Sequence, residues 1–309
     1  MKTTPEFDAF GPWIYEVRTP DEVPPLYRAH PIDLQAARVV LKVPRPIERR
    51  NAVPTMHLYD HLLVAGPDEL TVLSRDGETY GVRSVPYGRI GAAQVSVSLL
   101  DGRLRLADAT PGSGGELLTL AFNGVSLGTV DSLVDLLLER ALAGPVGEPA
   151  MPATSPVPPP AGQAGTWSVA GSDVALVVAY RELAERTPGL VRLADHSRVP
   201  VARRSSSWGA RILDRWWPMT LHAAVVAAAP GRVEVLHRRE LVSPASRPVH
   251  STARTALLTS AITGVAVGPH PGFAGALDCR LTVGDAVVHL AFPEGAPTVR
   301  ALRQVLDAR

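Results

Sequence analysis

The chain of 309 residues carries 31 basic against 30 acidic side chains, and 46% of its residues are hydrophobic. This near-neutral composition is typical of a folded globular protein, and it disfavours a nucleic-acid partner held by overall charge. The single cysteine, Cys279, excludes an internal disulfide and any metal site built from several cysteines. Because no apolar run has the length of a signal peptide or of a membrane span, we expect a cytoplasmic protein.

The first half of the sequence predicts a series of short strands followed by one helix. Alternating or apolar runs indicate strands over 58–65, 69–74, 79–85, 89–99, 103–107 and 117–122. Asp101-Gly102 lies between two of these runs and predicts a hairpin turn there. The period then changes to that of a helix, with Val130, Leu133 and Leu137 on one face. Thr129 is the expected N-cap of this helix.

Residues 144–165 are rich in proline and glycine and carry almost no charge. Such a composition suits neither a helix nor a strand ladder, so we expect an extended linker. A docking site for a partner that binds polyproline helices is the alternative for this segment. The chain is thus expected to consist of an N-terminal domain over 1–143, the linker over 144–165, and a C-terminal domain over 166–309.

The second half shows the same succession of strands and a final helix. It starts with a predicted helix over 173–186. Strand-like runs follow at 225–228, 233–237, 262–267, 277–283 and 287–292. Thr298 is the expected N-cap of a last helix that turns Val299 and Leu302 inward.

An internal repeat relates the two halves. Residues 54–75 align without a gap with residues 217–238 when they are shifted by 163 positions. Further along, Leu120-Ala121-Phe122 recurs as Leu290-Ala291-Phe292. A residue that the fold requires should appear in both copies, so the repeat separates structural residues from candidate functional ones.

Antiparallel strands ended by one amphipathic helix, once over roughly 56–142 and again over roughly 219–309, resemble the pleckstrin-homology (PH) superfold. The segment 46–52, followed by Leu58-Tyr59-Asp60, also resembles a family of uncharacterised bacterial proteins. The PH resemblance implies a mainly β (α+β) fold with two PH-like antiparallel β-sandwich or barrel modules. Each module would be closed by its C-terminal amphipathic helix.

Phosphoinositide-binding PH domains carry several basic residues between their first two strands, because several cations must meet several phosphates. The corresponding loops here are 65–69, which is acidic, and 229–232, which has one arginine. These loops disfavour specific phosphoinositide binding.

Two motifs suggest catalysis or metal binding, and the repeat argues against both. Residues 124–128 (GVSLG) match the nucleophile elbow of hydrolases around Ser126, but the second copy has no serine there. The strands before this motif also show hairpin turns instead of crossover helices. His57 and His61 are spaced like a helical metal pair, but on a strand they would lie about 13 Å apart. We therefore expect no catalytic residue, no metal site and no cofactor.

Two further candidates have structural explanations. The glycine-rich segment Pro111–Gly115 lacks the Lys-Ser/Thr of a phosphate-binding loop and precedes a strand, so it is interpreted as a hairpin loop. Cys279 falls in a strand-like run and is expected to be a buried, inert thiol. No small-molecule ligand is predicted.

Residues 203–217 combine arginine with tryptophan. The candidate surface consists of Arg203, Arg204, Trp208, Arg211, Arg215, Trp216 and Trp217. If the segment is helical, Trp208 and Trp216 share one face, with arginines beside them. Such a face suits an anionic lipid surface or a protein partner, and less well a nucleic acid. Packing of the tryptophans onto the core, with the arginines in solvent, is the structural alternative.

The sequence predicts a non-catalytic binding or scaffold protein whose partner is another protein. The partner would engage a sheet edge or the groove beside a closing helix. Peripheral association with an anionic membrane through 203–217 is the first alternative. An enzyme with a site in only one of the two copies is the second.

Overall fold

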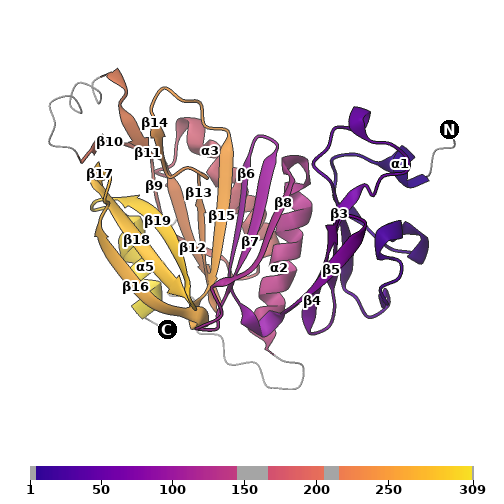
Figure 1. The fold of residues 1–309 in the computed structure, drawn as a ribbon. Helices are drawn as coiled ribbons and strands as arrows, with labels where there is room; N and C mark the ends of the chain where they lie inside the picture. The colour runs from indigo at the N-terminus through magenta and orange to yellow at the C-terminus, as the bar shows by residue number, and fades with distance from the viewer. Residues whose placement is uncertain (1–4, 145–165, 205–215, 308–309) are drawn as a thin grey trace.

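The computed structural model of the chain describes residues 5–144, 166–204 and 216–307. This part of the chain is mainly β, and its strands form four antiparallel sheets, none of which closes into a barrel. Figure 1 shows the N-terminal sheet at one end of the molecule and the C-terminal strands with the last helix at the other. A short helix, α1 (Pro5–Ala9), starts the described chain.

The N-terminal sheet has five strands in sequential order. They are β1 (Tyr15–Glu16), β2 (Val39–Pro44), β3 (Tyr59–Ala65), β4 (Glu69–Asp76) and β5 (Thr79–Pro86). Its two faces enter different clusters, since Leu63 and Val72 join the main core while Leu62 and Leu73 pack around Tyr27 of the N-terminal segment. Burial on both faces explains the adjacent apolar pairs Leu62-Leu63 in β3 and Val72-Leu73 in β4.

The largest sheet has seven strands and is shared by the two halves of the chain. In spatial order they are β8 (Glu116–Asn123), β7 (Asp101–Asp108), β6 (Ile90–Ser98), β15 (Ser251–Leu258), β13 (Arg232–His237), β12 (Ala224–Ala229) and β9 (Val191–His196). The halves meet where β6 pairs with β15, from Ser98 opposite Ser251 to Ala92 opposite Leu257. One continuous hydrogen-bonded ladder therefore joins residues that lie about 160 positions apart in the sequence.

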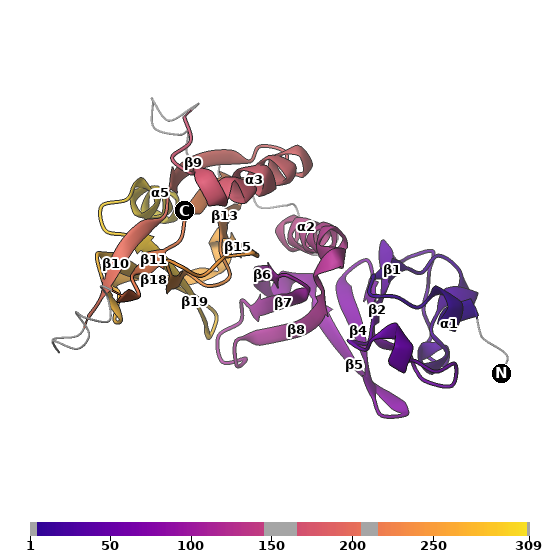
Figure 2. The ribbon, with the colours of Figure 1, turned by 90° about the horizontal axis from the view of Figure 1, so that it is seen from above.

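Different elements cover the two faces of the seven-stranded sheet. One face packs against α2 (Leu127–Ala143) and α3 (Val174–Arg186), and Figure 2 shows these two helices on the same side of the sheet. The alternation of β12 illustrates the division, because Val225 joins the α3 cluster while Val226 joins the main core. On the Val226 face lie a three-stranded sheet and α5 (Pro297–Asp307). The three strands are β16 (Ile262–Pro269), β18 (Ala276–Val283) and β19 (Ala286–Pro293).

A small fourth sheet lies in the C-terminal half. It consists of β14 (Val242–Pro244), β11 (Met219–Leu221), β10 (Val199–Arg203) and β17 (Phe273–Ala274) in that order. Leu221 and Met219 of β11 are buried against Ala276 and Ala291. This sheet holds the ends of the segment that carries the predicted arginine and tryptophan surface.

The stretches aligned by the sequence repeat form two hairpins of the same register. In the β3–β4 hairpin Ala65 faces Leu70, and in the β12–β13 hairpin Ala228 faces Val233, each 163 positions later. Equivalent residues therefore occupy equivalent places in the two hairpins.

Glycines allow close approach where the two halves meet. A Cβ atom on Gly284 would lie 2.3 Å from the Asp108 carbonyl oxygen, and one on Gly91 would lie 2.4 Å from Cγ1 of Val283. Only glycine fits such contacts. Gly284 also has φ +55°, which a side chain would disfavour.

Ion pairs between buried side chains also connect the two halves, beside the joint formed by the pairing of β6 with β15. Arg254 of β15 pairs with Glu234 of β13 at 2.9 Å and with Asp135 of α2 at 2.6 Å. Arg186 of α3 reaches Asp135 at 3.1 Å. Burial raises the pKa of the neighbouring Asp131. These ion pairs connect α2, α3, β13 and β15 on one face of the sheet.

All eleven strands and the three helices predicted from periodicity are present, with shifted ends. Both predicted N-caps are wrong, because α2 begins at Leu127 after Ser126, and Thr298 lies inside the first turn of α5. The hairpin turn predicted at Asp101-Gly102 is also misplaced, since both residues belong to β7. Most of the predicted linker, residues 145–165, lies outside the described residues, and the two-domain division stays a prediction.

Candidate functional site

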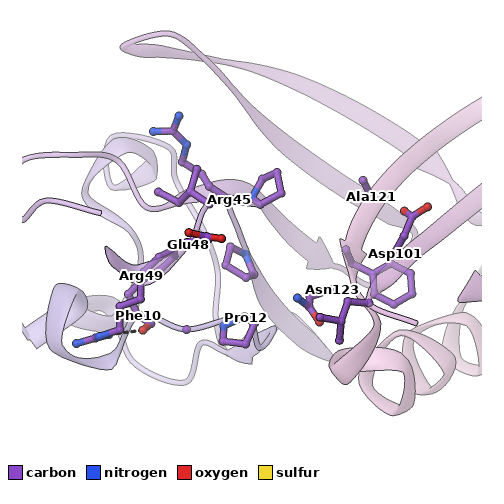
Figure 3. A pocket seen from close by; sticks show the side chains of 14 residues that line it. Phe10, Pro12, Arg45, Glu48, Arg49, Asp101, Ala121 and Asn123 are labelled. Carbon is purple, nitrogen blue, oxygen red and sulfur yellow. Dashed lines mark hydrogen bonds between the residues drawn. The ribbon is translucent and has the colours of Figure 1, made fainter. Parts of the chain in front are cut away.

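A hollow in the described part of the chain lies between the N-terminal segment and the start of β7. This pocket of about 550 Å³ is lined by Phe10, Gly11, Pro12, Pro44, Arg45, Pro46, Ile47, Glu48, Arg49, Leu100, Asp101, Ala121, Phe122 and Asn123. Figure 3 shows Phe10, Pro12 and Glu48 on one side of it, facing Ala121 and Asn123 on the other. Most of the lining is apolar, as in sites that bind ligands or peptide side chains.

Two arginines on the pocket wall are held by the backbone of the N-terminal half. Arg49 donates to the carbonyl oxygens of Phe10 and, at 3.1 Å, Asp8, and its guanidinium lies over the Phe7 ring. Arg45 donates to the His57 carbonyl oxygen at 3.2 Å. Their role is therefore to fix the loop 44–49 against the N-terminal segment, which gives the pocket a defined shape.

The turn between β6 and β7 forms one rim of the pocket and is strained. Leu99 has φ +55°, and it is the one described residue other than glycine with a positive φ. A left-handed conformation costs a residue with a side chain roughly 1–2 kcal/mol. Despite this cost, Leu99 and Leu100 direct their side chains to solvent, with 69% and 61% of their surfaces exposed.

Further apolar side chains are exposed near this turn. The Gly124 N–H donates to the Leu100 carbonyl oxygen at 2.8 Å, which brings Val125 close to the turn, and Val125 is exposed. Trp13 is half exposed and packs its ring against Gly11, which lines the pocket. We call Trp13, Leu99, Leu100 and Val125 the leucine-turn surface. Exposed apolar groups gathered around an apolar pocket are typical of interaction sites.

Ser126, the candidate nucleophile, has a structural role. It is buried, and its hydroxyl accepts a hydrogen bond from the Ile14 N–H at 2.8 Å. Ser126 is the last residue of the 3-10 turn Gly124–Ser126 and directly precedes α2. The serine ties the N-terminal segment to the start of α2, close to the pocket.

The two histidines considered as a metal pair have separate partners. His57 precedes β3 and lies 3.1 Å from a carboxylate oxygen of Glu78, while Nδ1 of His61 lies 2.9 Å from the Ser74 hydroxyl. Among the described residues there is no group of three or more His, Cys, Asp or Glu side chains that could hold a metal ion.

The glycine-rich loop Pro111–Gly115 lies between β7 and β8, where the sequence predicts a hairpin loop. Its backbone does hold an anionic group, but that group belongs to the same chain. The Asp285 carboxylate accepts hydrogen bonds from the N–H groups of Gly112 and Gly114, both at 2.9 Å. These hydrogen bonds lower the pKa of Asp285. The loop therefore attaches the first half to the β18–β19 turn of the second.

Two other reactive side-chain types are sequestered. Cys279 is buried, and burial raises the pKa of its thiol to about 11, so it is mostly a neutral thiol at neutral pH. The sequence did not single out His222 and Ser243, which form a pair with 2.8 Å between Nε2 and Oγ. Both residues are buried, and His222 Nδ1 has no hydrogen-bond partner among the described residues. This pair lacks the carboxylate and the access to substrate of a hydrolase site.

The predicted arginine and tryptophan surface is described only at its ends. Trp208, Arg211 and Arg215 lie outside the described residues. Arg203 donates to the Trp217 carbonyl oxygen at 3.2 Å, and Arg204 donates to that of Phe273 at 3.2 Å. Trp216 and Trp217 are 73% and 56% exposed, so they do not pack into the core as the structural alternative predicts.

The sequence did not predict the pocket or the leucine-turn surface. Comparison of the chain with models of known protein families, with curated proteins and with solved structures finds no match. In the part of the chain that the structure describes, no helix is both long and apolar enough to cross a membrane.

Proposed function

We propose that the protein is a non-catalytic binding protein that docks an apolar segment of a partner protein in the pocket beside the leucine-turn surface. The observation that carries this proposal is Leu99, which adopts a left-handed conformation while its side chain is largely exposed. A strained backbone conformation whose cost is not offset by burial of the side chain is typical of functional positions. The apolar lining and the volume of about 550 Å³ suit a few apolar side chains of an extended peptide.

The architecture that we propose behind this function is a pair of PH-like modules joined by a linker. The support is the order of elements, because β2–β5, β6–β8 and α2 in the first half resemble β9, β12, β13 and β15, then β16, β18 and β19, then α5 in the second. The second half adds the small sheet of β10, β11, β14 and β17 to this order. The equal register of the β3–β4 and β12–β13 hairpins adds to this support. In the proposed arrangement the pocket lies near the start of the first closing helix.

The test is a comparison of partners captured from the native host by the full chain and by the double variant Leu99→Gly, Leu100→Ser. Glycine adopts the left-handed conformation without strain, so the variant should unfold no more readily than the parent. We expect a protein that the parent captures to be lost with the variant. The purified partner should then bind the parent directly, and at least about tenfold more weakly to the variant.

A matched control is Val265→Ser, which also removes an exposed apolar side chain but lies in β16, in the other half of the chain. This variant should keep the partner. Equal capture by all three proteins would overturn the proposed site, and equal loss with both variants would point to a general effect of surface hydrophobicity.

A second candidate function is peripheral association with an anionic membrane. The exposed Trp216 and Trp217 beside Arg203 and Arg204 favour it, because tryptophan partitions to lipid interfaces and arginine attracts anionic headgroups. The test is co-sedimentation of the protein with vesicles that contain phosphatidylserine. Binding that Trp216→Ser and Trp217→Ser abolish would support this function, and absence of binding by the parent would remove it.

A further inference from the structure

Among the described residues, no further layer covers one face of β6 and β7 in the seven-stranded sheet, where alternate residues of β7 are exposed. Two adjoining hollows lie on it, of about 240 Å³ and about 210 Å³, and both are lined by Gln94 and Arg105. The first extends to Arg239 and Thr255 on the far side of the joint between the halves. The second ends against Val287 of β19. The second hollow is also lined by the acidic Glu116, so the name arginine groove is given to the first hollow alone.

The first hollow has an unusual charge for a chain whose net charge is +1. It is lined by Gln94, Val95, Ser96, Arg103, Arg105, His237, Arg239, Ala253, Arg254 and Thr255, and none of these is acidic. Arg254 is already neutralised by Glu234 and Asp135. Arg103, Arg105 and Arg239 remain as the cations of the groove.

These three arginines differ in whether a carboxylate of the same chain already pairs with them. Arg239 pairs with the Asp101 carboxylate at 2.8 Å, and Arg103 lies 3.7 Å from it. Arg105 is exposed, and its side chain forms no hydrogen bond or ion pair with any described residue. Asp101 is thus an internal competitor for two of the arginines, at the rim of the groove.

Neutral hydrogen-bonding groups line the floor between the arginines. Ser96 and Gln94 alternate along β6 on the same face, and the Gln94 amide donates to the Thr255 hydroxyl at 3.3 Å. Polar floor residues keep the groove hydrated, and a polar ligand would exchange water for hydrogen bonds there. The groove therefore suits an anionic ligand, whereas the apolar pocket beside the leucine turn does not.

We propose that the arginine groove binds an extended acidic peptide segment of a partner protein, in which every second residue is a carboxylate. Arg103 and Arg105 project from the same face of β7, about 7 Å apart along the strand. Alternate side chains of an extended peptide repeat at the same distance, so one carboxylate can meet each guanidinium. Arginine forms paired hydrogen bonds with carboxylates, which gives such contacts geometric specificity. This inference does not depend on the function proposed for the apolar pocket.

The experiment measures fluorescence anisotropy of a labelled peptide of alternating Glu and Thr titrated with the full-length protein. We expect Arg105→Gln to weaken binding by about tenfold or more, because a charge-assisted contact is lost. Asp101→Asn should tighten binding severalfold, since it frees Arg103 and Arg239. The affinity of the parent should fall as salt rises from about 50 to about 300 mM.

Two controls keep the outcome specific to the groove. Arg280→Gln removes an exposed arginine of β18, outside the groove, and should leave the affinity unchanged. A peptide of the same composition with its Glu residues in consecutive blocks should bind at least about tenfold more weakly. Thermal unfolding of each variant checks that the fold is intact.

The proposal fails if Arg105→Gln binds the alternating peptide as tightly as the parent does. It also fails if the block peptide binds equally well, or if pyrophosphate displaces the peptide at equal concentration, because the groove would then respond to charge alone. Weaker binding by Asp101→Asn would contradict the competing role of that carboxylate.

Discussion

Gln94 of β6 lies directly opposite Thr255 of β15, and its side-chain amide donates a hydrogen bond across the joint to the Thr255 hydroxyl at 3.3 Å. That hydroxyl lies 3.0 Å from Nε2 of His237, whose Nδ1 lies 2.7 Å from the Arg238 carbonyl oxygen. Because a carbonyl oxygen only accepts, Nδ1 carries the proton and Nε2 accepts from Thr255. The contact between the halves thus includes a neutral histidine of defined tautomer.

The stability of the protein should decrease in mild acid because of its buried histidines. Burial lowers the pKa of His237, and likewise those of His61, His196 and His222. In the unfolded chain these histidines have a pKa of about 6.5, so below this pH they are protonated there while the buried histidines of the folded chain stay neutral. The free energy of unfolding therefore keeps its full value above about pH 6.5 and decreases as the pH falls. Each such histidine contributes a slope of up to about 1.4 kcal/mol per pH unit. Urea denaturation from about pH 7.5 to about pH 5 measures the slope.

The variant His237→Gln serves as the control for this pH dependence. Glutamine does not titrate, so the slope of the free energy of unfolding against pH should be smaller than in the parent. An unchanged slope would show that His237 does not contribute.

Replacing Asp285 with Asn should loosen the attachment of the loop Pro111–Gly115. Asparagine has nearly the same shape, but it exchanges one acceptor oxygen for a donor and removes the charge, so one of the N–H groups of Gly112 and Gly114 loses its partner. We expect faster hydrogen–deuterium exchange of the segment 110–116. Asp307→Asn, an exposed change in α5, should leave that exchange unaltered. Equal protection in parent and Asp285→Asn would argue against the role of this carboxylate.

Gly284→Ala should destabilise the protein far more than Gly77→Ala, although both glycines have a similar positive φ, +55° and +61°. At Gly77 the new methyl group meets nothing within 4 Å, so only the conformational cost of about 1 kcal/mol applies. At Gly284 it would lie 2.3 Å from the Asp108 carbonyl oxygen of the other half. Urea denaturation measures the difference, which isolates the steric contribution of the joint. Similar losses in the two variants would mean that the joint can open without cost.

Arg254→Met should cost about 3–5 kcal/mol of unfolding free energy, because it leaves the buried Glu234 carboxylate without its main partner. The exposed pair of Arg280 and Asp278 offers the contrast, and Arg280→Met should cost at most about 1 kcal/mol. Chemical denaturation of both variants provides the comparison. A small loss with Arg254→Met would show that the network is replaceable.

The strands that the sequence predicts correctly carry a local signal, either an apolar run as in β12 or an alternation with one buried face as in β7. The strand β15 was not predicted, because its sequence STARTALL places Arg254 at a buried position. That arginine is tolerated there because Glu234 and Asp135 neutralise it, and both come from distant parts of the chain. The pairing of β6 with β15 could not be predicted either, because it also joins distant parts of the chain.

The misplaced turn between β6 and β7 has a packing explanation. Asp101-Gly102 has the composition of a hairpin turn, but a Cβ on Gly102 would lie 2.5 Å from the Phe122 ring. Gly102 is therefore needed inside β7, where it faces Phe122 of β8. The turn falls on Leu99 and Leu100 instead, and the strain at Leu99 follows from this register.

The candidate sites arise from segments that the sequence does not place together. The apolar pocket combines residues 10–12, 44–49, 100–101 and 121–123, and the arginine groove combines β6, β7 and β15. The composition shows that arginine and apolar residues are abundant, but not which of them are exposed. Only the tertiary arrangement shows which of them face the same hollow.

The pairing of β6 with β15 has a consequence for synthesis of the chain. When the ribosome has completed the first 144 residues, β6 is available but its neighbour is still to be translated. The nascent first half therefore presents a free strand edge, which is a template for pairing with a second nascent chain. Polysomes that carry several such chains would favour swapped dimers in which β15 of one molecule completes the sheet of another.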